Sequence, residues 1–311
     1  MTPVPADDSG IRVKVPAKVN LELRVGSRRA DGYHGLATVY QGVSLYDIVE
    51  ARPARDWSIT IGGRTAAGVP ADESNLAMRA AHDLAAACGV GQPVALSITK
   101  EIPVAGGMAG GSADAAATLV ACNRLWGLDL TLEELEPVAA GLGSDVPFLL
   151  HGGTCLGAGR GEQVVPLLSR GTYHWVFALA DTGLSAAAVY AESDRLRGSA
   201  PVPDPQPGIA LLSALRSGDA QAVAAQLTND LEAAAISLQP RLAEVLEAGL
   251  AFGALGGVVS GSGPTVAFLA RDRESAIDLA VALTASGVAP DVRRARGPVT
   301  GAQIDVLAPT P

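Results

Sequence analysis

The 311-residue sequence has few aromatic residues and few cysteines. Only 4% of its residues are Phe, Trp or Tyr, so its core must be built from Ala, Val and Leu. The three cysteines, Cys88, Cys122 and Cys155, lie far apart and form no C-x-x-C pair, which argues against a disulfide framework and against a zinc site. We expect all three to be small buried apolar residues.

The sequence also lacks an excess of basic residues and any long apolar run. Its net charge of −9 has the wrong sign for a protein that holds nucleic acid by its phosphates, so we expect no nucleic-acid partner. No run of about 18 apolar residues is available to span a membrane. Residues 1–8 are acidic and lack the apolar segment of a signal peptide. These features predict a cytoplasmic protein without a membrane partner.

Length and pattern indicate two domains of mixed structure. The chain is too long for one core of ordinary size and fits two units of roughly 150 residues. We expect an N-terminal domain over residues 1–169 and a C-terminal domain over residues 170–311. Strands and helices mix without a strict βαβ order, which favours an α+β fold. Residues 198–208 contain four prolines and are expected to form a stiff exposed loop inside the second domain. Monomer and homodimer both remain open.

Local patterns predict the individual elements. Apolar residues at alternate positions from residue 13 to 25 predict a half-buried strand, followed by a turn over 27–35. Thr131 and Glu134 form a capping box, but Pro137 should kink the helix that follows or delay its start. Further strands are expected at 38–48, 58–61, 94–99, 174–180 and 265–270, with a hairpin at 152–165 and helices at 75–88, 112–126, 210–217, 220–227, 240–252 and 274–285.

The strongest chemical signal is the glycine-rich stretch P-V-A-G-G-M-A-G-G-S-A-D-A-A at residues 103–116. Four glycines in six positions do not suit a packed helix or strand, and they let backbone N–H groups point at an anion. A helix starting at Ser112 would add the positive end of its dipole, so the expected ligand is a phosphate. A tight loop capped by Ser112 is the structural alternative. Neither a Walker A loop nor the G-x-G-x-x-G fingerprint is present.

This segment resembles the second conserved motif, P-x-G-x-G-L-G-S-S/G-x-A-A, of the GHMP kinases. Residues 16–21, P-A-K-V-N-L, resemble the N-terminal motif of that family, and residues 257–265 resemble its C-terminal glycine motif. Met108 and Ala109 replace the usual Leu and Gly, and Ala113 stands where Ser is common. The resemblance implies an ATP-dependent kinase with a ribosomal protein S5 domain 2-like N-terminal domain and a ferredoxin-like C-terminal domain.

Two further segments indicate a branch of the family. Residues 29–34, R-A-D-G-Y-H, and residues 142–148, L-G-S-D-V-P-F, resemble the GHMP kinases of the non-mevalonate isoprenoid route. The implied acceptor is the C2 hydroxyl of a methylerythritol linked to cytidine diphosphate, and the implied products are ADP and the 2-phosphate. Homoserine kinase activity is one alternative. A nucleotide-binding sensor without turnover is another; loss of Lys18 or Asp145 would mark it, and both residues are present.

Lys18 and Asp145 match the catalytic positions that the resemblance implies. Asp145 would accept the proton of the attacking hydroxyl as a general base, whereas a helix N-cap before Val146 is the structural alternative. Lys18 would stabilise the transferring phosphoryl group. Strand alternation alone would make Lys18 a solvated lysine. Asn20 projects to the same face of the strand and would hold the substrate.

Tyr33 and His34 are the candidates for the cytosine, Tyr33 by stacking and His34 by reading the edge of the ring. An ordinary packed turn is the alternative for both. Tyr190 is a weaker candidate for the other face of the base, and core packing is favoured for it. The resemblance implies Mg²⁺ bound with the nucleotide near the hydroxyl of Ser112. It also implies ATP contacts at Pro103, Val104, Ala105, Gly106, Gly107, Met108, Ala109, Gly110, Gly111, Ser112 and Ala113.

Overall fold

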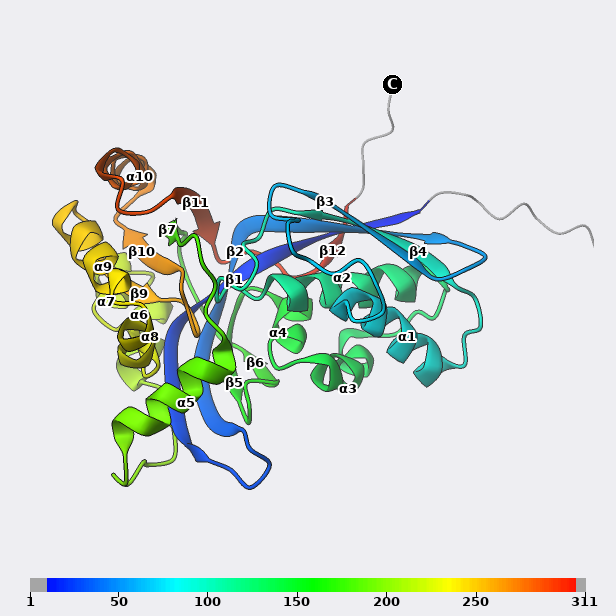
Figure 1. The fold of residues 1–311 in the computed structure, drawn as a ribbon, viewed down its shortest axis with the longest axis horizontal. Helices are drawn as coiled ribbons and strands as arrows, with labels where there is room; N and C mark the ends of the chain where they lie inside the picture. Colours follow the sequence, from blue (N-terminus) through cyan, green and yellow to red (C-terminus); the bar gives the residue numbers. More distant parts are fainter. Residues whose placement is uncertain (1–9, 306–311) are drawn as a thin grey trace, which may run out of the picture.

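The computed structural model describes residues 10–305, and two β-sheets organise this part of the chain (Figure 1). The larger sheet contains β1 (Ile11–Arg28), β2 (His34–Pro53), β3 (Ser58–Gly63), β4 (Val94–Lys100), β5 (Thr154–Ala158), β6 (Gln163–Pro166), β8 (Thr228–Asn229) and β12 (Gln303–Ile304). The smaller one contains β7 (Tyr173–Leu179), β9 (Gly256–Val259), β10 (Val266–Ala270) and β11 (Asp291–Gly297). The strand order of the larger sheet is β12-β1-β2-β4-β3; in addition, β5 pairs with β2, β6 with β5 and β8 with β1. The strand order of the smaller sheet is β11-β7-β10-β9. Each predicted strand is present.

The long strands β1 and β2 form an antiparallel pair that runs from one half of the molecule to the other (Figure 1). The predicted turn between them is confirmed, and its hairpin tip lies at residues 29–33. The prediction of half-burial is wrong, because β1 is buried on both faces from Val15 to Leu23. Segments of the C-terminal half cover the second face, and β8 pairs with β1 directly. As a result, Lys18 is only 4% exposed to solvent.

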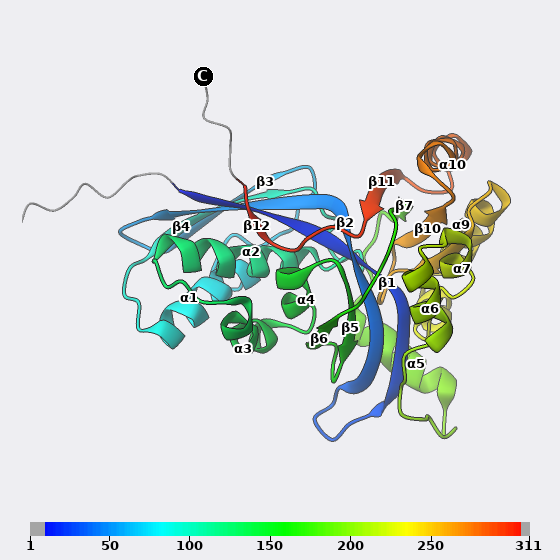
Figure 2. The same cartoon turned by 180° about the vertical axis from the view of Figure 1, so that it is seen from behind.

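Four helices cover one face of the larger sheet (Figure 2). They are α1 (Leu76–Cys88), α2 (Gly110–Leu125), α3 (Leu132–Leu142) and α4 (Val146–His151). The side chain of Asn75 caps α1, and Gly89 ends it in the left-handed conformation. The capping box of α3 is confirmed, but the delayed start is wrong, because α3 begins directly after Thr131 and includes Pro137. The buried face formed by Leu135, Ala139 and Leu142 offsets the hydrogen bond lost at Pro137.

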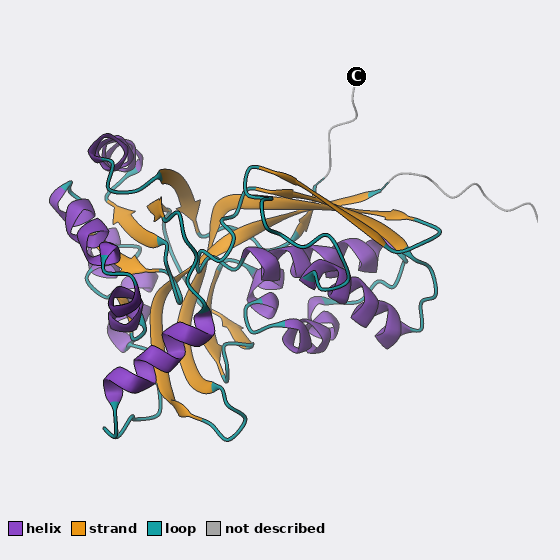
Figure 3. Cartoon of the chain, viewed as in Figure 1, coloured by secondary structure: helices purple, strands orange, loops and turns teal. Residues whose placement is uncertain are grey.

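The C-terminal half contributes a second group of helices, separate from α1–α4 (Figure 3). These are α5 (Ala186–Arg197), α6 (Ile209–Ser217), α7 (Ala220–Ala224), α8 (Glu232–Leu238), α9 (Arg241–Ala251) and α10 (Arg273–Ser286). Helix α5 lies beside the long strands β1 and β2, and the others gather near the smaller sheet (Figure 1). Helices α5 and α8 were not predicted from the sequence, and α7 ends before the predicted end at residue 227. The proline-rich stretch between α5 and α6 is irregular, as predicted.

The two halves share one buried core. The main apolar cluster contains Leu84 and Phe148 from the first half together with Trp175 and Leu215 from the second. The indole Nε1 of Trp175 also donates a hydrogen bond to Oε1 of Gln41 at 2.9 Å. A boundary between residues 169 and 170 therefore stays a prediction.

Burial of the cysteines differs from expectation at one position. Cys122 and Cys155 are buried, but Cys88 is exposed because the last residue of α1 faces solvent. In the portion of the chain that the structure covers, no helix combines the length and the apolar character needed to cross a bilayer.

Candidate active site

A cavity of about 830 Å³ opens where β1, the start of α2 and α5 come together. Its lining includes all five side chains predicted for catalysis and for the acceptor, namely Lys18, Asn20, Tyr33, His34 and Asp145. From the predicted nucleotide segment it includes Pro103, Ala105, Gly106, Gly107, Ala109, Gly110, Gly111 and Ser112. The other three do not line it: Val104 is exposed, and Met108 and Ala113 are buried in the core. Residues far apart in the sequence therefore converge on one cavity.

Residues 103–109, here called the phosphate loop, lead directly into α2. The helix starts at Gly110, two residues before the predicted start, and its N-cap is Ala109. Ala109 cannot supply a side-chain cap, so the first N–H groups of α2 have no side-chain partner. The alternative of a loop capped by Ser112 is wrong, because Ser112 lies within the first turn. A helix N-terminus of this kind in a cavity wall favours an anionic ligand.

Lys18 and Asp145 lie together in the cavity wall. The ammonium Nζ of Lys18 is 3.9 Å from Oδ2 of Asp145. Burial lowers the pKa of Lys18, and the nearby Asp145 carboxylate opposes this shift. Asp145 occupies the N-cap position of α4, but its side chain makes no capping hydrogen bond. The Asp145 carboxylate is therefore not used to cap α4.

A chain of hydrogen bonds fixes the orientation of Lys18. Its ammonium donates to Oδ1 of Asn20 at 2.6 Å, and Nδ2 of Asn20 donates to Oγ1 of Thr38 at 2.8 Å. The hydroxyl of Thr38 then donates to the backbone carbonyl of Glu22 at 2.7 Å. A register shift in the β1–β2 ladder lies between Asn20 and Glu22, and such bulges re-aim side chains next to functional sites. Lys18 thus has one defined position.

Tyr40 is a site residue that sequence reasoning missed. It lies opposite Asn20 in the β1–β2 register, and its ring stacks on Phe148 of α4 with the centroids 4.8 Å apart. Burial raises the pKa of Tyr40 well above its ordinary value, and the Asp145 carboxylate raises it further. Tyr40 therefore keeps its proton and presents a neutral hydroxyl beside Asp145.

Three aromatic side chains, Tyr33, His34 and Tyr190, also line the cavity. Tyr33 is 53% exposed at the tip of the β1–β2 hairpin, and the guanidinium of Arg160 lies 4.8 Å from its ring centroid. His34 is buried and accepts or donates a hydrogen bond at Nε2 with Oδ1 of Asp194, at 2.9 Å. Its ring stacks on Tyr190 at a centroid distance of 5.0 Å. Of these three rings, that of Tyr33 is the exposed one, whereas Tyr190 packs on His34 and against the core.

The C-terminal glycine motif, residues 257–265, closes the cavity from the C-terminal half. The hydroxyl of Ser260 donates to the carbonyl of Gly107 in the phosphate loop at 3.1 Å. Gly261 and Ser262 line the cavity beside Lys18. The side chain of Asn229 fixes this motif by donating to the carbonyls of Val259 and Gly261 at 2.8 and 2.7 Å. The motif match pointed to this segment, but nothing in the sequence pointed to Asn229.

The described residues contain no group of three or more His, Cys, Asp or Glu side chains suited to hold a metal ion. Ser112 is the predicted protein ligand, and its position in the cavity lining at the start of α2 is compatible with that role.

Comparisons with known proteins identify the family of this chain. The family model described as GHMP kinases N terminal domain matches residues 75–153, and the one described as GHMP kinases C terminal matches residues 211–289. The chain belongs to the GHMP kinases, and the predicted two-domain fold of that family is confirmed.

Two relatives within this family carry the same name. The 4-diphosphocytidyl-2-C-methyl-D-erythritol kinase of Rhodococcus jostii is 54% identical over 292 residues, which are 94% of this chain and 94% of that protein. The enzyme of the same name from Mycobacterium tuberculosis is 54% identical over 304 residues, or 96% and 94%. The chain belongs with them in the 4-diphosphocytidyl-2-C-methyl-D-erythritol kinase branch.

Solved structures of GHMP kinases are also similar to this chain. A crystal structure of 4-(cytidine 5'-diphospho)-2C-methyl-D-erythritol kinase has a TM-score of 0.74 at 32% identity, covering 92% of this chain and 98% of that one. A homoserine kinase from Cytophaga hutchinsonii has a TM-score of 0.73 at 20% identity, covering 97% and 99%. The second likeness concerns the fold alone.

Proposed function

We propose that the protein transfers the γ-phosphoryl group of ATP to the C2 hydroxyl of 4-diphosphocytidyl-2-C-methyl-D-erythritol, giving ADP and the 2-phosphate. The observation that carries this proposal is that one cavity brings together three kinds of group. The uncapped start of α2, the pair Lys18 and Asp145, and the exposed ring of Tyr33 all line it.

The central pair supports a direct transfer to a hydroxyl group. Asp145 acts as the general base and accepts the hydroxyl proton while the oxygen attacks the γ-phosphorus. The cationic ammonium of Lys18, held by Asn20 and lying 3.9 Å from Asp145, stabilises the negative charge of the transferring group. Tyr40 remains neutral and orients the Asp145 carboxylate.

The nucleotide is held by the phosphate loop and the first turn of α2. When bound with the nucleotide, Mg²⁺ would neutralise charge on the phosphates, and Ser112 would be its ligand from the protein. The protein would work in the cytoplasm on small molecules, as a monomer or a homodimer.

The cytidine end of the acceptor occupies the region around Tyr33. The exposed ring of Tyr33 stacks on the cytosine, and His34 uses its remaining ring nitrogen, Nδ1, to read the edge of the base. The contact of Nε2 with Asp194 fixes the orientation of the imidazole for this purpose. The stack of Tyr190 on His34 supports the same orientation of the imidazole. This contact favours a packing role for Tyr190.

A competition of acceptors tests the proposal. The purified protein is given ATP and Mg²⁺ with 4-diphosphocytidyl-2-C-methyl-D-erythritol, 2-C-methyl-D-erythritol 4-phosphate or homoserine, and phosphorylated products are followed by ³¹P NMR. The cytidine-linked acceptor should have a kcat/KM about 5- to 150-fold above that of the sugar phosphate. The reason is that stacking on one base contributes about 1–3 kcal/mol. Preference for homoserine would refute the substrate but not the kinase. Binding of ATP without transfer to any acceptor would indicate a sensor.

A further inference from the structure

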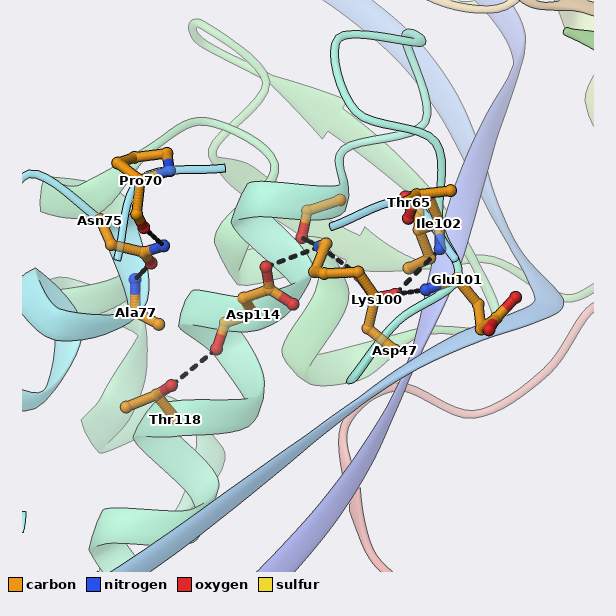
Figure 4. Close-up of polar contacts among 11 residues, drawn as sticks. Asp47, Thr65, Pro70, Asn75, Ala77, Lys100, Glu101, Ile102, Asp114 and Thr118 are labelled. Carbon is orange, nitrogen blue, oxygen red and sulfur yellow. Dashed lines mark hydrogen bonds and ion pairs between the residues drawn. The ribbon is translucent and has the colours of Figure 1, made fainter. Parts of the chain in front are cut away.

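Three ionisable side chains form a cluster in the core beneath the phosphate loop (Figure 4). Lys100 at the end of β4 lies between Asp47 of β2 and Asp114 of α2. Its ammonium donates to Oδ2 of Asp47 and, at 2.6 Å, to Oδ2 of Asp114. The three side chains are almost fully buried, with residue exposures of 2% for Lys100 and Asp114 and 0% for Asp47. None of them lines the cavity.

The cluster holds both ends of the phosphate loop. At the entry, Oδ1 of Asp47 accepts hydrogen bonds from the backbone N–H groups of Glu101 and Ile102, at 2.6 and 2.9 Å (Figure 4). At the exit, Lys100 donates to the carbonyl oxygen of Gly110, the first residue of α2, at 3.2 Å. Asp47 thus holds the start of the loop of residues 103–109, Lys100 holds its end, and Asp114 is bonded to Lys100.

Such a cluster is a poor means of gaining stability. Removing charges from water costs several kcal/mol per ion, and apolar residues of similar volume often stabilise a core equally well. One oxygen of Asp114, Oδ1, is buried without a hydrogen-bond partner among the described residues. The directional contacts of the cluster, rather than its net energy, therefore distinguish it from apolar packing.

We propose that Asp47, Lys100 and Asp114 are positioning residues that form a clasp at the base of the phosphate loop and thereby set its affinity for the phosphates of the nucleotide. The inference rests on the proposed use of ATP. The three side chains do not touch the nucleotide, and they act through the backbone at Glu101, Ile102 and Gly110. Opening the exit side of the clasp lets the first turn of α2 move away from the position in which its N–H groups meet the phosphates.

The double variant Lys100→Met/Asp47→Asn tests the clasp. It removes two opposite charges together and keeps an amide oxygen for the N–H groups of Glu101 and Ile102, and it removes the bonds of Lys100 to Gly110 and to Asp114. Asp114→Ala is the second variant. It removes one partner of Lys100, and Lys100 keeps its contacts with Asp47 and Gly110. The matched control is Leu84→Ala, a fully buried residue of α1 outside the cluster, which should lower Tm without opening the loop.

Two measurements on folded protein decide the outcome. Calorimetry with Mg²⁺ and the non-hydrolysable analogue AMP-PNP should give an affinity about tenfold weaker in both clasp variants, the size expected for a lost hydrogen bond to a charged group. Steady-state kinetics should give a raised KM for ATP and an unchanged KM for the cytidine-linked acceptor, with Leu84→Ala equal to wild type in both.

Unchanged AMP-PNP affinity in the clasp variants, or an equal loss in Leu84→Ala, would overturn the inference. So would failure of the wild type to bind AMP-PNP at all. A wild type that binds AMP-PNP but phosphorylates none of the three acceptors would refute the proposed function, and calorimetry would still test the clasp.

Discussion

Gly261 lies directly against the ammonium group of Lys18. A Cβ atom at position 261 would be 2.9 Å from Nζ of Lys18 and 3.2 Å from the carbonyl oxygen of Gly107, and the residue has a φ of +57°. Both the contact and the left-handed backbone require glycine. The backbone of the C-terminal motif therefore forms part of the surface that fixes the lysine.

Gly261→Ala should displace Lys18 and lower kcat. The lysine is buried and bonded to Asn20, so its ammonium has little free space, and a misplacement of about 1 Å costs about 10²-fold in rate. The control is Gly287→Ala, because Gly287 has a φ of +68° and a Cβ atom there would meet no other atom within 4 Å. Stopped-flow and steady-state assays should give a normal kcat for the control. Equal rates in the two variants would show that the contact with Lys18 is irrelevant.

Asp145→Asn should reduce kcat by about 10²-fold or more and leave the affinity for AMP-PNP almost unchanged, because the amide keeps the shape but cannot accept the proton. Single-turnover kinetics and calorimetry measure the two effects separately. Asp83→Asn, on the exposed face of α1, removes the same charge away from the cavity and should behave as wild type. Near-normal turnover in Asp145→Asn would remove this residue from the mechanism.

Tyr33→Ala should raise KM for the cytidine-linked acceptor by about 5- to 150-fold, since stacking on one base contributes about 1–3 kcal/mol. KM for ATP should not change. Tyr46→Ala is the matched control, because Tyr46 also packs against a cation, with Nζ of Lys14 4.2 Å from its centroid, but is not part of the cavity lining. The assignment fails if both tyrosine variants discriminate the acceptors as well as the wild type does.

Stability should depend on pH through Asp114. Burial raises the pKa of Asp114 to about 8, and the charge of Lys100 opposes this shift. Between the ordinary value of 3.8 and about 8, the folded protein holds a proton that the unfolded chain has released, so the free energy of unfolding falls as pH rises. Because Asp114→Asn removes this group, its stability relative to wild type should increase from pH 5 to about pH 8 and then level off.

Urea denaturation of both proteins across this pH range measures the difference. Asp47 faces the same ammonium and stays in both proteins, so its contribution largely cancels. Asp83→Asn, which alters an exposed carboxylate, should run parallel to wild type. Parallel curves for Asp114→Asn as well would mean that Asp114 is ionised in the folded protein at neutral pH.

Residues carried by motifs could be predicted from the sequence, and residues brought in by tertiary packing could not. Lys18 and Asp145 were predicted from their match to motifs of the GHMP kinases, and the phosphate loop was predicted from its glycines as well as from that match. Tyr40 enters the site only through the register of β1 with β2, which three irregularities shift along the ladder. A strand pattern gives the face of a residue but not its partner across the sheet.

The helices show the same limit. Helix α5 carries Asp194 to the cavity, but only two of its residues are buried, so it lacks a clear apolar stripe. The start of α2 at Gly110 was placed too late because glycine has a low helix propensity, which the contact of Lys100 with Gly110 overrides. Burial of both faces of β1 depends on segments more than 200 residues away.

The strands that return to β1 bear on how ligands reach the cavity. β8 and β12 follow the smaller sheet's first strand in the sequence, yet both pair with β1, and the indole of Trp175 bonds across to Gln41. A large hinge rotation between the halves would break these pairings. Substrate entry and product release should therefore depend on local movements of the exposed hairpin tip and the loops around it, and not on opening and closing of whole domains.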